Sequence, residues 1–386
     1  MNDKAPVVRV VFASTVFGHS ANGPETYARY LWEGLAHDPE IQFHLVAPDF
    51  PGAHPRWHAA GRGSGSLDLY HRVAQTALQV AGSLNSGKVK AILHSNNSNL
   101  HPSLLAYGGP LWGQVNDYEN VDWWRRAGET IRRAGWRRFL ALGRRRWLER
   151  RFVARQDLTL CNSDFTRQKI LAEYHPAHPE RILTLPKAVD VDFFRRPHAM
   201  PADPLGRPAT ARKFVFVGRD IVRKGLDTLL RAVALLPAGL DWHLAVVGVE
   251  RAEVATAFPN ISLAGLDSKL QFAGIMDKEA LRRVLWSSDV FVLPSRAEAL
   301  GVALLEALAA GLPVVAAKVG GIPEIIRHPA AGSLIAPDNP VALAQALAQA
   351  QPWTAGAVPA QVRDILDFYS TSAMINRLRE LYLRAG

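Results

Sequence analysis

Two glutamates, Glu298 and Glu306, stand eight positions apart in SRAEALGVALLEALAAGLPVVAAKVGGIPEII, residues 295–326. The pattern places Glu298 in a loop after a strand and Glu306 inside the helix that follows. Carboxylates accept hydrogen bonds from vicinal hydroxyls, so two at different depths can hold two sugar rings of one elongated ligand. Backbone amides near Leu300 and Gly301 would point toward the same ligand. The structural alternative makes Glu298 a partner of the helix dipole and Glu306 a solvated helix residue.

A second candidate group lies between a strand and a helix in KFVFVGRDIVRKGLDTLLRAV, residues 213–233. Gly218 and Gly225 let a ligand approach the backbone closely, and the helix N-terminus favours an anion. Arg219 offers a planar fork and Lys224 a point charge, a combination suited to a diphosphate. The spacing of a Walker phosphate loop is absent. Two solvated basic residues in a turn are the simpler alternative.

The elements that must position these side chains follow an alternating order. In the first half, the pattern predicts strands at 7–14, 43–48 and 90–95, and helices at 23–36 and 67–84. Strands that alternate with helices of this length indicate βαβ units and a parallel sheet. Open sheets of this kind bind ligands beyond the carboxyl ends of their strands, so we expect the site in the loops that follow strands.

The same alternation restarts after a break rich in proline, and the sequence therefore predicts two α/β domains. The expected boundaries are 1–195 for the first domain, 196–212 for the linker, 213–365 for the second domain and 366–386 for a C-terminal helix that packs back on the first domain. A chain of 386 residues is too long for one core, and its 48% hydrophobic and 21% charged residues are typical of a globular protein.

The sequence predicts a cytoplasmic protein. The only cysteine, Cys161, excludes an internal disulfide and suits a reducing compartment. No uncharged apolar run reaches the roughly 18 residues that a transmembrane helix requires. The start, MNDKAPVVRVVFAS, is typical of a first strand and not of a signal peptide, because Arg9 interrupts the apolar run and no small-residue cleavage site follows.

The formal charge of +10 is concentrated in one segment, residues 123–152, which holds eleven arginines and two glutamates. On a helical wheel Trp136, Phe139, Leu140 and Trp147 share one face, and most of the arginines lie elsewhere. A basic amphipathic helix with tryptophans is typical of a binder of anionic membrane surfaces. The alternative is a helix whose apolar face packs on its own domain. Nucleic-acid binding is not expected, because no recognition motif accompanies the charge.

The two glutamates and the glycine-rich stretch behind them resemble the signature of retaining glycosyltransferase family 4. Further similarity covers nearly the whole chain and is looser in the N-terminal half. The stretches that resemble the family are ANGPETYARYL, CNSDFTRQKIL, LPKAVDVDFF, GRDIVRKG and FAGIMDKEALRRVLWSSDVFVLPS. The resemblance implies the GT-B fold, in which two Rossmann-like, doubly wound domains face each other across a cleft. It also implies that the first domain binds the acceptor and the second binds a nucleotide sugar.

The resemblance further implies roles for individual residues. Glu306 would hold the ribose, Arg219 and Lys224 the diphosphate, and Glu298 the transferred sugar. The remaining donor-binding positions are Gly23, Gly218, Gly274, Ile275, Ala299, Leu300 and Gly301. The donor would be a UDP- or GDP-sugar, transferred with retention and without a bound metal or other cofactor. The two cations explain this physically, because they can take the developing charge on the leaving diphosphate.

Two positions depart from the family pattern. Asn116 stands where members commonly carry a histidine near the donor sugar, and an asparagine cannot titrate. Asp117, the next residue, or Glu119 could contact the acceptor instead. The family's P-N-G-V-D run reads PKAVD here, with Lys187 and Ala188 in its centre.

The leading hypothesis is a retaining glycosyltransferase of cell-envelope polysaccharide or glycolipid synthesis, peripheral at the inner face of the membrane. Its acceptor would be a carbohydrate or a lipid-linked sugar, with a soluble small-molecule acceptor as an alternative. An epimerase or a phosphorylase of the same fold is a further alternative. A dinucleotide-dependent oxidoreductase is disfavoured because neither domain opens with G-x-G-x-x-G. A binding module without catalysis is disfavoured by the complete donor-site pattern.

Overall fold

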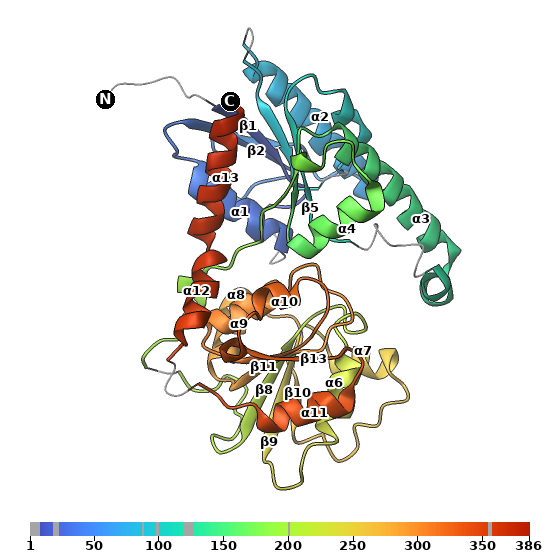
Figure 1. Ribbon diagram of the computed structural model, residues 1–386, viewed down its shortest axis with the longest axis vertical. Coiled ribbons are helices and arrows are strands. Elements are labelled where there is room, and N and C mark those ends of the chain that lie inside the picture. Colours follow the sequence, from blue (N-terminus) through green and yellow to red (C-terminus); the bar gives the residue numbers. More distant parts are fainter. Residues whose placement is uncertain are drawn as a thin grey trace. The chain divides into compact units, whose positions relative to one another are not determined.

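The computed structural model describes residues 8–17, 23–86, 89–97, 100–118, 127–199, 201–353 and 357–386. The chain forms two compact units (Figure 1). Unit 1 comprises Met1–Lys187 and Ser372–Gly386, and unit 2 comprises Ala188–Thr371.

Unit 1 is built on a seven-stranded sheet with the order β3-β2-β1-β4-β5-β6-β7, in which the paired strands are parallel. The strands are β1 (Val8–Ala13), β2 (Ile41–Ala47), β3 (Trp57–Ala59), β4 (Ile92–Ser95), β5 (Leu111–Val115), β6 (Leu158–Cys161) and β7 (Ile182–Thr184). Most of their residues are buried, as expected for a parallel sheet with helices on both faces. The strand order reverses direction beside β1, which is the usual position of a ligand site.

The helices of unit 1 are α1 (Gly23–Leu35), α2 (Ser66–Leu84), α3 (Ala127–Arg155), α4 (Asp164–Tyr174) and α13 (Thr371–Ala385). The last of these returns to unit 1 from the far end of the sequence and lies alongside α1 (Figure 1). Its Tyr382 is fully buried, and the Tyr382 ring stacks on Trp112 of β5 at 5.0 Å. Arg379 of the same helix pairs with Asp38 at 2.6 Å. Unit 1 therefore depends on a helix distant in sequence.

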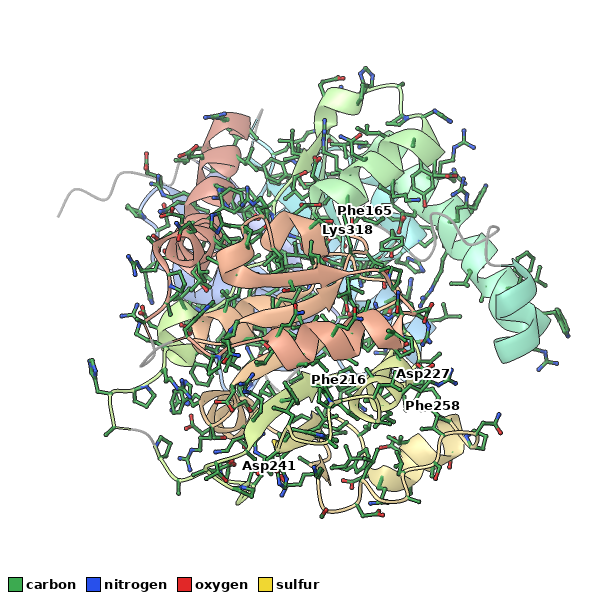
Figure 2. The ribbon with its side chains drawn as sticks, turned by 60° about the horizontal axis from the view of Figure 1, so that its bottom comes forward. Phe165, Phe216, Asp227, Asp241, Phe258 and Lys318 are labelled. Atoms are coloured by element: carbon green, nitrogen blue, oxygen red, sulfur yellow. The ribbon has the colours of Figure 1, made fainter. Side chains whose placement is uncertain are left out.

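Unit 2 is built on a six-stranded parallel sheet with the order β10-β9-β8-β11-β12-β13. The strands are β8 (Arg212–Val217), β9 (Trp242–Val247), β10 (Leu270–Phe272), β11 (Val290–Leu293), β12 (Val314–Ala317) and β13 (Gly332–Ile335). The β-branched and aromatic residues of these strands, among them Phe216 (Figure 2), fill one continuous hydrophobic core.

Helices cover both faces of this second sheet (Figure 1). They are α5 (Val191–Phe194), α6 (Leu226–Val233), α7 (Arg251–Ala257), α8 (Lys278–Trp286), α9 (Val302–Ala309), α10 (Ile322–Ile325), α11 (Pro340–Gln349) and α12 (Ala360–Phe368). α6 packs with α11, whereas α9 packs with α5 and α12. Sequence signals fix where helices begin: Asp277 caps α8 by accepting a 2.7 Å hydrogen bond from the amide of Ala280.

The division between the units falls after Lys187, upstream of the segment 196–212 that composition favours as a linker. Side chains of that segment are anchored in unit 2. Arg207 is buried, pairs with Asp203 at 2.9 Å and donates to Ser288 Oγ at 3.2 Å. The charged side chains of Arg207 and Asp203 therefore belong to unit 2.

Candidate functional site

The two predicted side-chain groups of unit 2 lie in neighbouring loops at the carboxyl edge of its sheet. β8 and β11 are adjacent, with Val215 opposite Phe291, so the loops that follow these strands run side by side. Their approach is close enough to require glycine at position 225. Gly225 has φ +70°, and a Cβ there would lie 2.0 Å from the carbonyl oxygen of Pro294.

An ion pair joins the two loops: the Lys224 ammonium bonds Glu298 Oε1. Both side chains are largely buried, with 15% of Lys224 and 7% of Glu298 exposed. Ser295 Oγ donates a further hydrogen bond to the same carboxylate oxygen at 3.1 Å. Glu298 is therefore held in one orientation by two donors.

Glu306 lies within α9, as the sequence predicts, and its surroundings perturb it strongly. Desolvation raises the pKa of Glu306 from 4.5 to about 7, while the positive charges of Lys278 and Lys224 act in the opposite direction. Glu306 is thus not an ordinary solvated helix residue. Lys224 therefore contacts Glu298 directly, whereas it acts on Glu306 only through its charge.

Arg219 lies in the loop after β8, next to Gly218, and is exposed. No carboxylate of the described part of the chain pairs with it. Arg296 has the opposite character, because its guanidinium binds both carboxylate oxygens of Asp227 at 2.8 Å. It also pairs with Asp338 at 2.7 Å. The ion pairs of Arg296 stabilise the loop that carries Glu298, whereas Arg219 is available to bind an anion from outside the protein.

The other predicted donor-binding residues of unit 2 lie in the same strand-end loops. Gly218 follows β8, and Gly274 and Ile275 follow β10, where Gly274 accepts a 2.7 Å hydrogen bond from the amide of Gly248. Ile275 is 69% exposed, in contrast to the buried Ala299 and Leu300. Gly301 is the N-cap residue of α9. The structure thus brings the predicted residues of unit 2 to one edge of its sheet.

The predicted residues of unit 1 lie at the carboxyl edge of its own sheet. Gly23 is the first residue of α1, and Asn116 and Asp117 follow β5. Asn116 Nδ2 donates to the carbonyl oxygen of Asn96 at 2.6 Å, and Asn162 Nδ2 donates to that of Asn116 at 2.9 Å. The Oδ1 atoms of Asn116 and Asn162 are buried and find no donor within the described part of the chain. Such atoms are acceptors for a ligand's hydroxyl groups.

Three residues of these edges were not predicted as site residues: Lys278, Ser295 and Asn162. Each follows a strand or begins a helix at a strand end, which is the signal that could have found it. His94, by contrast, is structural. It is fully buried, its Nδ1 lies 2.5 Å from the hydroxyl of Tyr382, and burial lowers its pKa to about 3.

The described residues contain no group of three histidines, cysteines or carboxylates arranged to hold a metal ion. None of the helices they form is long and apolar enough to cross a membrane.

Comparison with known families matches both halves of the chain. Residues 21–193 match the model "Glycosyltransferase Family 4", and residues 202–351 match "Glycosyl transferases group 1". The chain belongs to glycosyltransferase family 4. The family carries the GT-B fold, and the two parallel Rossmann-like sheets confirm the expected fold class.

Individual relatives agree with this assignment. The D-inositol 3-phosphate glycosyltransferase of Mycolicibacterium gilvum is 34% identical over 206 residues, which are 52% of this chain and 46% of that protein. The match thus spans about half the length of that relative. Sucrose-phosphate synthase from Thermosynechococcus elongatus has the same fold, with a TM-score of 0.75, 20% identity and 98% of both chains covered. HepE of Anabaena, solved with UDP-glucose, has a TM-score of 0.66 at 17% identity and covers 97% of this chain and 98% of its own.

Proposed function

We propose that the chain is a retaining glycosyltransferase that moves a sugar from a nucleoside diphosphate to an acceptor hydroxyl. The observation that carries the proposal is the ion pair of Lys224 with Glu298 at the carboxyl edge of the unit 2 sheet, with Glu306 in the helix α9 that follows Glu298. Family membership supports the reaction class, and the complex of HepE with UDP-glucose supports the donor class.

The geometry of unit 2 suits the parts of such a donor. Arg219, exposed and without a carboxylate partner in the described chain, would bind the diphosphate together with Lys224. Glu306 would accept hydrogen bonds from the ribose hydroxyls. Glu298 would bind the transferred sugar, beside the amides at the start of α9 near Gly301. The two carboxylates would thus hold opposite ends of the donor.

Catalysis would consist of positioning and charge stabilisation. Retention without an obvious enzyme nucleophile favours attack of the acceptor on the face from which the diphosphate leaves, and an oxygen of that diphosphate would take the acceptor proton. Lys224 and Arg219 would stabilise the negative charge that develops on the leaving group, in place of a metal ion. In unit 1, the unsatisfied Oδ1 of Asn116 and the carboxylate of Asp117 would receive acceptor hydroxyls.

The test begins with a thermal-shift screen of nucleotide sugars, because a ligand that binds only the folded state raises the unfolding temperature. With the donor found, Lys224→Ala should lower kcat roughly 100-fold. Glu306→Ala should instead weaken donor binding. Lys269→Ala is the matched control, because Lys269 precedes β10 at the opposite edge of the sheet. Wild-type kinetics in both site variants would refute the proposal.

We further propose that α3 attaches the enzyme to anionic membranes, where a lipid-linked or polysaccharide acceptor of the cell envelope would be available. Trp136, Leu140 and Trp147 are 61%, 55% and 55% exposed, and their spacing places them on one face of the helix. The face that packs on unit 1 is a different one and carries Leu142 and Phe152. The alternative of an apolar face folded against the domain therefore does not apply to these two tryptophans.

Arginines flank this exposed face, with the Arg137 guanidinium 5.7 Å from the Trp136 ring and the Arg151 guanidinium 4.8 Å from the Trp147 ring. Interfacial indoles and basic side chains together favour a negatively charged bilayer surface. Residues 123–126 of the predicted segment lie outside the described residues, as does Glu119.

Vesicle sedimentation tests this attachment. The wild type should bind vesicles that contain anionic lipid more strongly than neutral ones, and Trp136→Ser/Trp147→Ser should weaken binding to both, because it removes the apolar contact and keeps the arginines. Leu235→Ser is the control, because Leu235 is a similarly exposed apolar residue of unit 2. Equal partitioning of the wild type to both vesicle types would exclude the electrostatic mechanism.

A further inference from the structure

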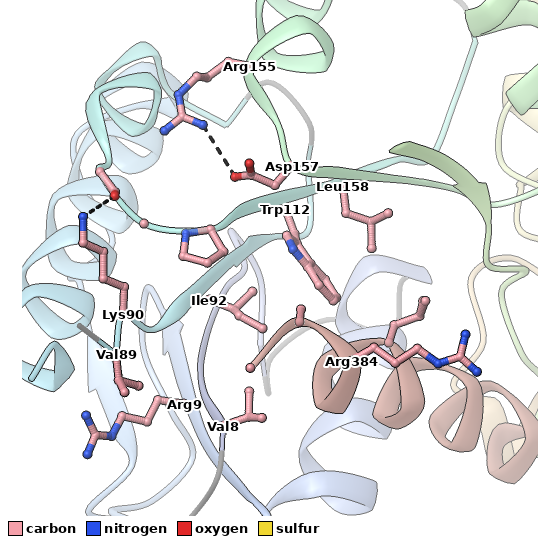
Figure 3. Close-up of a pocket in the computed structure, with 16 residues that line it drawn as sticks. Val8, Arg9, Val89, Lys90, Ile92, Trp112, Arg155, Asp157, Leu158 and Arg384 are labelled. Carbon is pink, nitrogen blue, oxygen red and sulfur yellow. Dashed lines mark hydrogen bonds and ion pairs between the residues drawn. The ribbon is translucent and has the colours of Figure 1, made fainter. Parts of the chain in front are cut away.

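A pocket of about 750 Å³ lies at the edge of the unit 1 sheet opposite to the candidate site (Figure 3). The amino ends of β1, β4, β5 and β6 and the last turn of α13 surround it. Because all paired strands are parallel, Asn116 and Gly23 lie at the other edge of the sheet. The pocket therefore cannot be part of the site described above.

The rim of the pocket is strongly basic. Arg9, Lys90, Arg155 and Arg384 line it, against the single carboxylate side chain of Asp157. The net side-chain charge is therefore 4 − 1 = +3. A rim of this charge attracts an anion.

Two of these cations have no carboxylate partner in the part of the chain that the structure describes. Arg9 NH1 donates to the carbonyl oxygen of Leu84 at 2.7 Å and to Ser86 Oγ at 2.6 Å. Lys90 Nζ donates to the carbonyl oxygen of Gly108 (Figure 3). These neutral acceptors hold the side chains in position and leave both positive charges uncompensated. Both charges are thus available to a ligand.

The floor of the pocket is apolar. Ile92, Trp112, Leu158 and Leu381 contribute to it, and the Trp112 side chain projects from β5 into the space between the sheet edge and α13 (Figure 3). Trp112 is 97% buried, since only 3% of it is exposed. None of the described residues accepts a hydrogen bond from its indole nitrogen. The floor can therefore contact a hydrocarbon body, and the indole N–H can donate one hydrogen bond to a polar atom of the same ligand.

We propose that this pocket binds a phosphate monoester that carries an apolar body. A phosphate monoester has a charge of about −1.5 to −2 at neutral pH and so matches the rim better than a single carboxylate does. The phosphate binds Arg9, Lys90 and Arg155, and the body lies on Trp112 and Leu381. Such a molecule occurs free in solution or as the headgroup region of a membrane lipid.

Calorimetric titration of the full chain with hexyl phosphate, inorganic phosphate and hexanol tests the proposal. Hexyl phosphate should bind at least tenfold more tightly than inorganic phosphate, and hexanol should not saturate. Arg9→Gln/Lys90→Gln should weaken hexyl phosphate binding at least tenfold. Arg62→Gln, which removes an exposed arginine outside the pocket, should leave it unchanged. Equal affinity for hexyl phosphate and inorganic phosphate, or an unaffected double variant, would overturn the proposal.

A second measurement distinguishes the two sources of the ligand. Vesicles with phosphatidic acid display a phosphate monoester on a lipid, and Arg9→Gln/Lys90→Gln is compared with the wild type on them. Weaker binding of the double variant supports a lipid ligand. Unchanged vesicle binding, together with weaker hexyl phosphate binding, supports a soluble one. Leu381→Ser should reduce the affinity for hexyl phosphate and not that for inorganic phosphate, and the reverse pattern would contradict the assigned orientation.

Discussion

Replacement of Glu306 by glutamine should stabilise the protein at high pH. The pKa of Glu306 is about 7 in the folded chain and 4.5 in the reference state. The folded state therefore holds this proton more tightly, so ionisation of Glu306 disfavours folding progressively as the pH rises from 4.5 through 7. By proton linkage, ionisation of Glu306 lowers the free energy of unfolding by about 0.8 kcal/mol at pH 5 and by about 3.4 kcal/mol at pH 8.5. Glu306→Gln does not titrate, so relative to the wild type it should gain at most about 2.6 kcal/mol between these two pH values.

Urea unfolding of both proteins at pH 5 and pH 8.5 measures this gain, because the difference between variant and wild type cancels the titration of all other groups. Asp364→Asn provides the control, since Asp364 is an exposed carboxylate on α12 of the same unit. A pH-independent difference between Glu306→Gln and the wild type would refute the desolvation of Glu306. The same ionisation should affect the donor: if the carboxylate form binds the ribose, affinity for the nucleotide sugar rises with pH through about 7.

Two further substitutions test packing at particular contacts. Gly225→Ala should destabilise unit 2 by about 1–3 kcal/mol, because its Cβ would collide with Pro294 and the backbone has positive φ; an unchanged urea midpoint would show that the two loops can separate. Tyr382→Phe should cost about 1–3 kcal/mol, because it leaves the buried Nδ1 of His94 without its partner. If Tyr382→Phe and the wild type have the same urea midpoint of unfolding, the role assigned to α13 is contradicted.

The order of strands and helices was largely predictable, because period and punctuation are local properties of a sequence. The helix predicted at 67–84 is α2 (Ser66–Leu84), and the helix predicted at 23–36 is α1 (Gly23–Leu35). The three-residue strand β3 (Trp57–Ala59) was not predicted, because so short a strand carries no measurable alternation. It exists because it pairs with β2, a contact between residues well separated in sequence.

Site residues were predictable where a charged side chain lies in a loop that follows a strand, as for Glu298 and Lys224. Contacts that depend on tertiary packing were not. Lys187 stands where the family pattern has an asparagine, and only the fold shows what it contacts. Lys187 Nζ donates to Gln114 Oε1 at 2.8 Å and lies 3.2 Å from the centre of the Tyr27 ring. Burial lowers the pKa of Lys187 well below its usual range. Lys187 therefore ties β5 to α1 in unit 1, and no local pattern encodes its two distant partners.

The pairing of Lys224 with Glu298 bears on how the proposed donor site is maintained without a ligand. Two buried charges of opposite sign stabilise each other, whereas either one alone would carry a large desolvation cost. An incoming diphosphate offers Lys224 a second anionic partner, and the hydroxyls of the sugar offer Glu298 new donors. Each group can therefore exchange part of one favourable interaction for another, while Ser295 keeps the Glu298 carboxylate in place throughout. Preorganisation of this kind lets charge stabilisation act on the leaving diphosphate with little rearrangement of the protein.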